Sequence, residues 1–119
     1  MHVLKKEAAP RYVRAEGITS YLLASPRTCA AAHLTTTLAV IEPGGEQRLH
    51  SHAPEQVYFI LEGSGLMTVG GESQRVGPGD CVFIPSGEPH GLKNDGAARL
   101  RYFSAAAPAY PPGEAETRD

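Results

Sequence analysis

Residues 79–94 read GDCVFIPSGEPHGLKN, a stretch that follows the pattern G-x5-P-x-G-x2-H-x3-N. Its prolines and glycines restrict or permit the backbone angles of a tight turn, and that turn delivers His90. Upstream, residues 44–63 follow the pattern G-x5-H-x-H-x3-Q-x6-G and contain His50, His52 and Gln56. A chance match to the first pattern, with its fixed offsets, is on the order of 1 in 10,000 in a chain this short.

The two stretches together resemble the paired sequence motifs of the cupin superfamily. The resemblance covers roughly residues 34–103 and is closest to small single-domain bacterial cupins. It implies an all-β fold, the double-stranded β-helix or jelly-roll barrel, with a divalent metal held on histidines inside it. The chain departs from the family pattern at Gln56, where a Glu ligand is usual.

The spacing of apolar runs also predicts an all-β chain. Short β-branched and apolar runs separated by Gly and Pro turns are typical of a jelly roll. We expect strands at residues 12–13, 18–23, 33–41, 46–52, 56–61, 66–69, 72–76, 81–84, 92–94 and 98–104. The barrel then spans residues 33–104. An N-terminal segment, 1–32, precedes it with short strands and a part in the dimer interface, and a mobile tail, 105–119, follows it.

Length, charge and cysteine content exclude several classes of function. A chain of 119 residues makes one domain, and its net charge of −2 gives no basic field, so we expect no nucleic-acid partner. The chain contains no run of about 18 apolar residues, so we expect no membrane span. The first residues lack the apolar region of a secretory signal. The two cysteines form no disulfide framework, which favours a cytoplasmic location.

His50, His52, Gln56 and His90 are the predicted metal ligands. Side chains at i and i+2 of a strand share a face, so His50 and His52 project together. Gln56 can return to that face after the turn at residues 53–54, and His90 arrives from a distant strand. Such a set suits one divalent ion of Mn, Fe, Co, Ni, Cu or Zn. The alternatives are two histidines on a solvated strand, and a Gln56 that hydrogen-bonds a bound water.

Strand parity adds three candidate catalytic residues. Arg48 shares parity with His50 and could anchor a substrate carboxylate, although a solvated rim charge explains it equally well. Tyr58 and Tyr102 could line the cavity or be ordinary core aromatics. The opposite face of the strongest strand carries Val57, Phe59 and Leu61, and such an apolar outer face predicts a homodimer.

The reaction is less determined than the fold, because one fold hosts many chemistries. A neutral Gln56 leaves the full charge on the ion, which favours a small anionic or enolisable molecule. We expect a metal-dependent oxygenase-like enzyme. The alternatives are a metal-dependent sugar or uronate isomerase or lyase, and a non-catalytic cupin that binds a small molecule.

Overall fold

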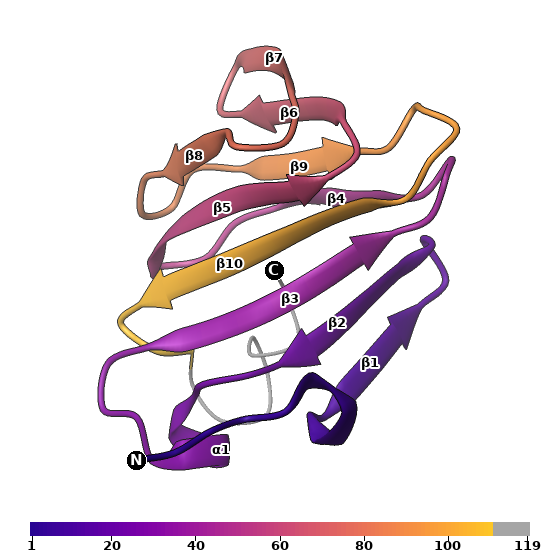
Figure 1. Cartoon of the computed structure of the whole chain (residues 1–119). Helices are drawn as coiled ribbons and strands as arrows, with labels where there is room; N and C mark the ends of the chain where they lie inside the picture. Colours follow the sequence, from indigo (N-terminus) through magenta and orange to yellow (C-terminus); the bar gives the residue numbers. More distant parts are fainter. Residues whose placement is uncertain (111–119) are drawn as a thin grey trace.

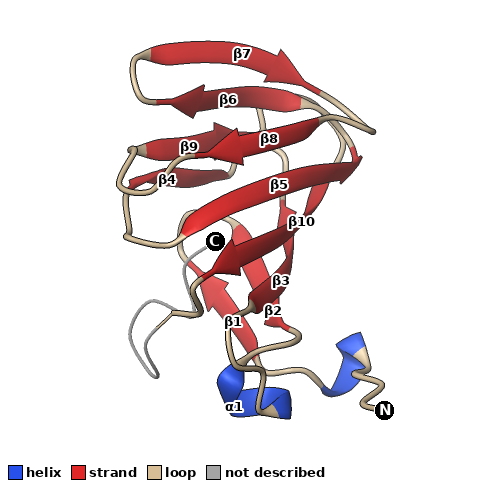
Figure 2. Cartoon of the chain, turned by 90° about the vertical axis from the view of Figure 1, so that its left-hand side faces the viewer, coloured by secondary structure: helices blue, strands red, loops and turns tan. Residues whose placement is uncertain are grey.

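The chain folds into two antiparallel β-sheets that face each other, which confirms the predicted all-β jelly roll (Figures 1 and 2). The structure is a computed structural model that describes residues 1–110. The first sheet has the strand order β1 (Arg11–Arg14), β2 (Ile18–Leu22), β3 (Thr35–Ile41), β10 (Leu100–Ala107), β5 (Glu55–Glu62) and β8 (Cys81–Ile84). The second sheet has the order β4 (Glu46–His50), β9 (His90–Lys93), β6 (Gly65–Val69) and β7 (Glu72–Val76).

The core lies between the two sheets. Burial alternates with period two along β2 and β10, as expected for strands with one face on the core. The fully buried apolar side chains include Ile18, Ile41, Ile60, Leu92 and Leu100. Polar side chains share this inner face, and in the strand register Thr37 lies opposite Ser104, which in turn lies opposite Tyr58. The interior is therefore partly polar beside the candidate site.

Within residues 1–110, two short helical segments accompany the sheets. A 3-10 helix spans Lys6–Ala8, and α1 spans Pro26–Cys29. The side chain of Ser25 caps α1 by accepting a hydrogen bond from the Thr28 amide. No helix in the described part of the chain is long and apolar enough to cross a membrane.

β4 and β9 form the part of the second sheet that positions the site. They pair antiparallel and bring His50 opposite His90. The register shifts between Gln47 and His50, and β4 ends at His50 instead of continuing to His52 as the sequence predicts. The close approach of the two strands requires Gly91, since a Cβ there would lie 2.8 Å from the Gln47 carbonyl oxygen and 3.1 Å from the Leu49 amide nitrogen.

β10 ends three residues later than the sequence predicts. It runs through Ala107, past residue 104, and Ala106 faces the core. After it the chain turns back along the barrel, and the backbone N–H of Tyr110 donates to the Thr35 hydroxyl at 3.1 Å. Tyr110 is 2% exposed. The remainder of the predicted tail, residues 111–119, lies outside the described residues.

The outer face of the first sheet carries a row of apolar side chains. In the strand register Leu38 lies opposite Phe103, Phe103 opposite Phe59, and Phe59 opposite Cys81. Phe59 is 40% exposed, and Phe83 on the edge strand β8 is 56% exposed. We call this row, with Phe83, the outer apolar face.

Candidate metal centre

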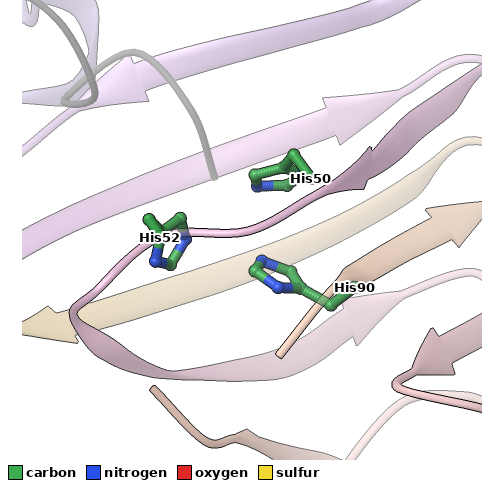
Figure 3. Close-up of side chains that lie close together, drawn as sticks. All are labelled: His50, His52 and His90. Carbon is green, nitrogen blue, oxygen red and sulfur yellow. The ribbon is translucent and has the colours of Figure 1, made fainter. Parts of the chain in front are cut away.

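Three histidines from two strands and one connecting loop converge inside the barrel (Figure 3). His50 ends β4, His52 follows it, and His90 begins β9. One ring nitrogen from each histidine lies within 4.8 Å of the other two. The ring centroids of His50 and His90 are 4.3 Å apart, and those of His52 and His90 are 5.0 Å apart. Nitrogens that share a zinc-like ion lie about 2.1 Å from it and therefore at most about 4.2 Å apart. An inward shift of less than about 1 Å would bring all three nitrogens into that range.

All three imidazoles are held by the same kind of hydrogen bond. Nδ1 of His50 contacts the Arg48 carbonyl oxygen at 2.8 Å, Nδ1 of His52 the Pro54 oxygen at 3.1 Å, and Nδ1 of His90 the Glu88 oxygen at 3.0 Å. A carbonyl oxygen only accepts, so each Nδ1 must carry the proton. The lone pair of each neutral ring is then on Nε2. This arrangement orients histidine ligands in metal sites and fixes their tautomer.

Electrostatics favour a neutral His52. Burial lowers the pKa of the His52 imidazole below its usual value, because a buried site disfavours the charged ring. The neighbouring His50 lowers it further, whereas the Pro54 carbonyl and the Gln56 amide oppose the shift. A neutral imidazole is the form that binds a metal. The lowered pKa therefore keeps His52 in its metal-binding form to a lower pH.

Gln56 lies beside the histidines at the start of β5 and is 2% exposed. Its Nε2 donates to the Ser104 hydroxyl at 2.5 Å, which sets the orientation of the amide. The Oε1 atom is buried, and no donor in the described residues satisfies it. A buried carbonyl oxygen without a donor costs free energy unless a further partner, such as a cation, is present. The amide therefore fits a ligand role.

Comparisons with known proteins identify the kind of domain that holds these residues. The sequence model of the cupin domain matches residues 37–105, more than half of the chain. The chain belongs to the cupin family. RemF, a polyketide cyclase from Streptomyces resistomycificus, has a similar structure, with a TM-score of 0.79, 27% identity and coverage of 94% of this cupin and 82% of that chain.

Curated relatives differ in what their names report. An uncharacterised protein of Methanocaldococcus jannaschii is 32% identical over 83% of this cupin and 80% of its own length. A dimethylsulfoniopropionate lyase of Ruegeria pomeroyi is 37% identical over 59% of this chain, and an acireductone dioxygenase of Rhodopseudomonas palustris is 38% identical over 48%. The matches span only 47% and 39% of those two enzymes. The likeness therefore covers less than half of each of these two enzymes.

Tyr58 and Tyr102 are both buried in the cupin barrel. Their rings stack with centroids 4.2 Å apart, and the Tyr58 ring meets the edge of His90 at 5.9 Å. Tyr58 therefore contacts a candidate ligand, whereas Tyr102 packs behind Tyr58. The sequence predicted that both tyrosines could line the cavity. In the structure the Tyr58 ring is the one in contact with His90.

Arg48 lies at the rim of the cupin barrel instead of inside it. Its side chain is 71% exposed, and its Nε atom lies 3.8 Å from Glu16. The sequence analysis assumed regular alternation along the strand, which puts Arg48 and His50 on one face. The register shift between Gln47 and His50 breaks that alternation. Gln47 is buried in its place and accepts a hydrogen bond from Arg14 at 3.2 Å. The geometry thus matches the rim-charge alternative for Arg48.

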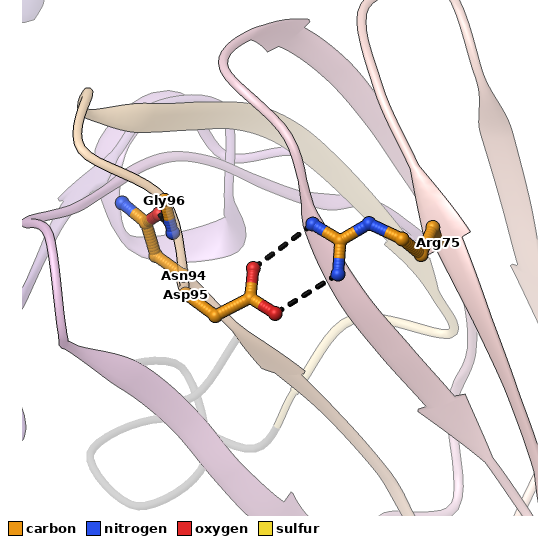
Figure 4. Close-up of polar contacts among 4 residues, drawn as sticks. All are labelled: Arg75, Asn94, Asp95 and Gly96. Atoms are coloured by element: carbon orange, nitrogen blue, oxygen red, sulfur yellow. Dashed lines mark hydrogen bonds and ion pairs between the residues drawn. The ribbon is translucent and has the colours of Figure 1, made fainter.

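Asn94, the last residue of the second motif, fastens the turn that follows β9. Its Nδ2 donates to the carbonyl oxygens of Ile41 and Ala98, each at 2.9 Å, and its Oδ1 accepts from the Gly96 amide. The next residue, Asp95, makes a two-pronged ion pair with Arg75 on β7, at 2.9 Å for each contact (Figure 4). The motif asparagine therefore stabilises the connection from β9 to β10.

Tyr110 is a site residue that the sequence analysis missed. Its hydroxyl lies 3.1 Å from Nε2 of His52, and the two rings are 4.9 Å apart. It lies in a stretch rich in alanine and proline that the sequence places beyond the barrel. Only its isolated aromatic character in that stretch could have drawn attention to it.

Proposed function

We propose that this cupin binds one divalent transition ion, one of Mn, Fe, Co, Ni, Cu or Zn, through Nε2 of His50, His52 and His90 and Oε1 of Gln56. The observation that carries the proposal is that three clustered imidazoles each turn Nδ1 to a backbone carbonyl oxygen, which makes Nε2 the ligand atom of each ring. The buried Oε1 of Gln56 supports a fourth ligand.

We infer that the molecule acted upon is small and anionic or enolisable. None of the four proposed ligands brings a formal negative charge, and the histidine cluster in the described residues contains no carboxylate. The ion would supply Lewis-acid and redox chemistry at this position. An oxyanion supplied by the bound molecule would compensate the charge that the protein leaves uncompensated. The buried Tyr58 next to His90 would exclude water from one side of the site.

The reaction that we favour is an oxygenase-like one on an enolate or a similar anion. The neutral ligand set supports it. Uncharged ligands keep the ion electron-poor, and an electron-poor ion attracts an enolate. A relative named acireductone dioxygenase is 38% identical over 48% of this chain. Metal analysis of the purified protein, followed by oxygen-consumption assays with a panel of enols and phenols, tests this proposal. Metal-loaded protein that consumes no oxygen with any of them would refute the oxygenase assignment.

A lyase or isomerase is the second candidate. Tyrosine can act as a general acid or base, and the rings of Tyr58 and Tyr110 both contact candidate ligand histidines. A relative named dimethylsulfoniopropionate lyase is 37% identical over 59% of this chain. This candidate predicts product formation without oxygen and a large loss of rate in Tyr58→Phe. The third alternative, non-catalytic binding, predicts ligand affinity with no turnover under either condition.

The remaining parts of the proposal concern assembly and location. We propose a homodimer formed through the outer apolar face, because Phe59 and Phe83 stay partly exposed there. The two free cysteines, Cys29 and Cys81, fit a reducing compartment such as the cytoplasm. No nucleic acid or membrane has a part in this proposal.

A further inference from the structure

The segment after β10 places a phenol against the atom of His52 that the metal proposal requires. The Tyr110 hydroxyl lies 3.1 Å from Nε2 of His52. Nδ1 of His52 faces the Pro54 carbonyl oxygen at 3.1 Å and must donate to it. Nε2 is therefore an acceptor, and the Tyr110 hydroxyl is the donor. Nε2 has one lone pair, so it can accept from Tyr110 or bind an ion, but it cannot do both.

Tyr110 is held where it is by its own backbone. Its N–H donates to the buried Thr35 hydroxyl at 3.1 Å, and its side chain is almost fully buried. The ring of Tyr110 also packs on the ring of His52 at a tilt of 64°. A hydroxyl released from Nε2 therefore remains within the site, because the anchored backbone and the packed ring limit how far it can move.

From these contacts we propose that Tyr110 is a ligand-positioning residue with two partners. In the metal-free protein its hydroxyl caps Nε2 of His52. In the metal-loaded protein the same hydroxyl donates to an anionic molecule bound at the ion. The inference rests on the proposed function, because it takes Nε2 of His52 as a metal ligand.

The exchange of partners predicts two effects of opposite sign for Tyr110→Phe. Removing the hydroxyl removes a hydrogen bond that metal binding must break, so the variant should bind Zn²⁺ more tightly. Removing it also deletes a donor to the bound anion, so the Co²⁺-loaded variant should bind azide more weakly. One net hydrogen bond corresponds to about 2- to 10-fold in each dissociation constant. A change in the barrel as a whole would shift both constants in the same direction.

The test measures Zn²⁺ affinity by competition with a chromophoric chelator and azide affinity from the visible spectrum of the Co²⁺ protein. Tyr21→Phe is the matched control, because that ring lies on β2 under Lys6 and away from the histidines. Thr35→Val is a second variant that keeps the phenol but removes the acceptor of the Tyr110 N–H. It should also tighten Zn²⁺ binding, since a loosened segment caps Nε2 less well.

The outcomes separate this inference from the proposed function. Tighter Zn²⁺ and weaker azide binding in Tyr110→Phe, with an unchanged Tyr21→Phe control, support the positioning role. Equal or weaker Zn²⁺ binding, or unchanged azide affinity, overturns it while leaving the metal site in place. A wild-type protein that binds no metal at all overturns both.

Discussion

His90 on β9 lies directly opposite His50 at the end of β4, and their ring centroids are 4.3 Å apart. The two residues are far apart in sequence, and only the pairing of β4 with β9 brings them together. The pairing in turn depends on Gly91, which lets the Gln47 carbonyl oxygen approach closely. The metal proposal therefore depends on the packing of one strand pair.

Gly91→Ala tests this dependence. The added Cβ would lie 2.8 Å from the Gln47 carbonyl oxygen, so β4 must move. Such overpacking costs about 1–3 kcal/mol, and we expect the free energy of unfolding to fall by that amount together with a weaker metal affinity. Gly71→Ala is the control, because a Cβ at Gly71 meets nothing within 4 Å. Denaturant melts and metal titration measure both effects, and a Gly91→Ala protein with unchanged metal affinity would contradict the strand-pair argument.

The chemical role of Gln56 predicts the effect of Gln56→Glu. A carboxylate brings one negative charge to the ion, so the variant should keep the metal or bind it more tightly. It should also bind azide or a substrate-like enolate more weakly and lower the redox potential of the site. Gln74→Glu on the exposed strand β7 controls for added charge alone. If the metal spectrum and the anion affinity are the same in Gln56→Glu and wild type, Gln56 is not a ligand.

The lowered pKa of His52 predicts how the metal-free protein responds to acid. Below the usual value of about 6.5, the unfolded chain takes up a proton that the folded imidazole still refuses. The free energy of unfolding should therefore fall as the pH drops from 6.5 through the lower folded pKa. Urea melts of chelator-treated protein at pH 7.5 and pH 5 measure this loss.

The matched variants for the acid response are His52→Gln and His33→Gln. The first should reduce the loss of stability, whereas the second should preserve it, because His33 is an exposed residue outside the cluster. An acid response that is identical in wild type and His52→Gln would assign the loss to other groups.

The outer apolar face predicts the oligomeric state. Burial of apolar surface contributes roughly 25 cal/mol per Å², and a standard interface buries about 1,600 Å² in total. Phe59→Lys should convert a dimer into a monomer, because it puts a charge in the middle of the row. Leu49→Lys is the control, since Leu49 is exposed on the other sheet. Sedimentation of the wild type as a monomer at micromolar concentration would disprove the dimer.

The sequence predicted the fold well because its motifs and its alternating strands point to the same architecture. It also identified the three histidines that the structure brings together, because all three occupy fixed offsets in the two motifs. Strand alternation suggested an inward-facing Arg48, whereas the side chain is exposed. The cause is a register shift in β4, which the order of residues does not reveal. Tyr110 was missed for a different reason. It reaches His52 through the return of the chain after β10, a long-range contact with no local pattern.

The most direct test of the account is the metal content of two purified proteins, the wild type and the His50→Ala/His52→Ala double variant. We expect close to one transition ion per chain in the wild type and a loss of nearly all of it in the double variant. The variant should still unfold cooperatively, because the buried apolar side chains between the sheets hold the barrel together. Full metal occupancy in the double variant, or no metal in the wild type, would contradict the proposed centre.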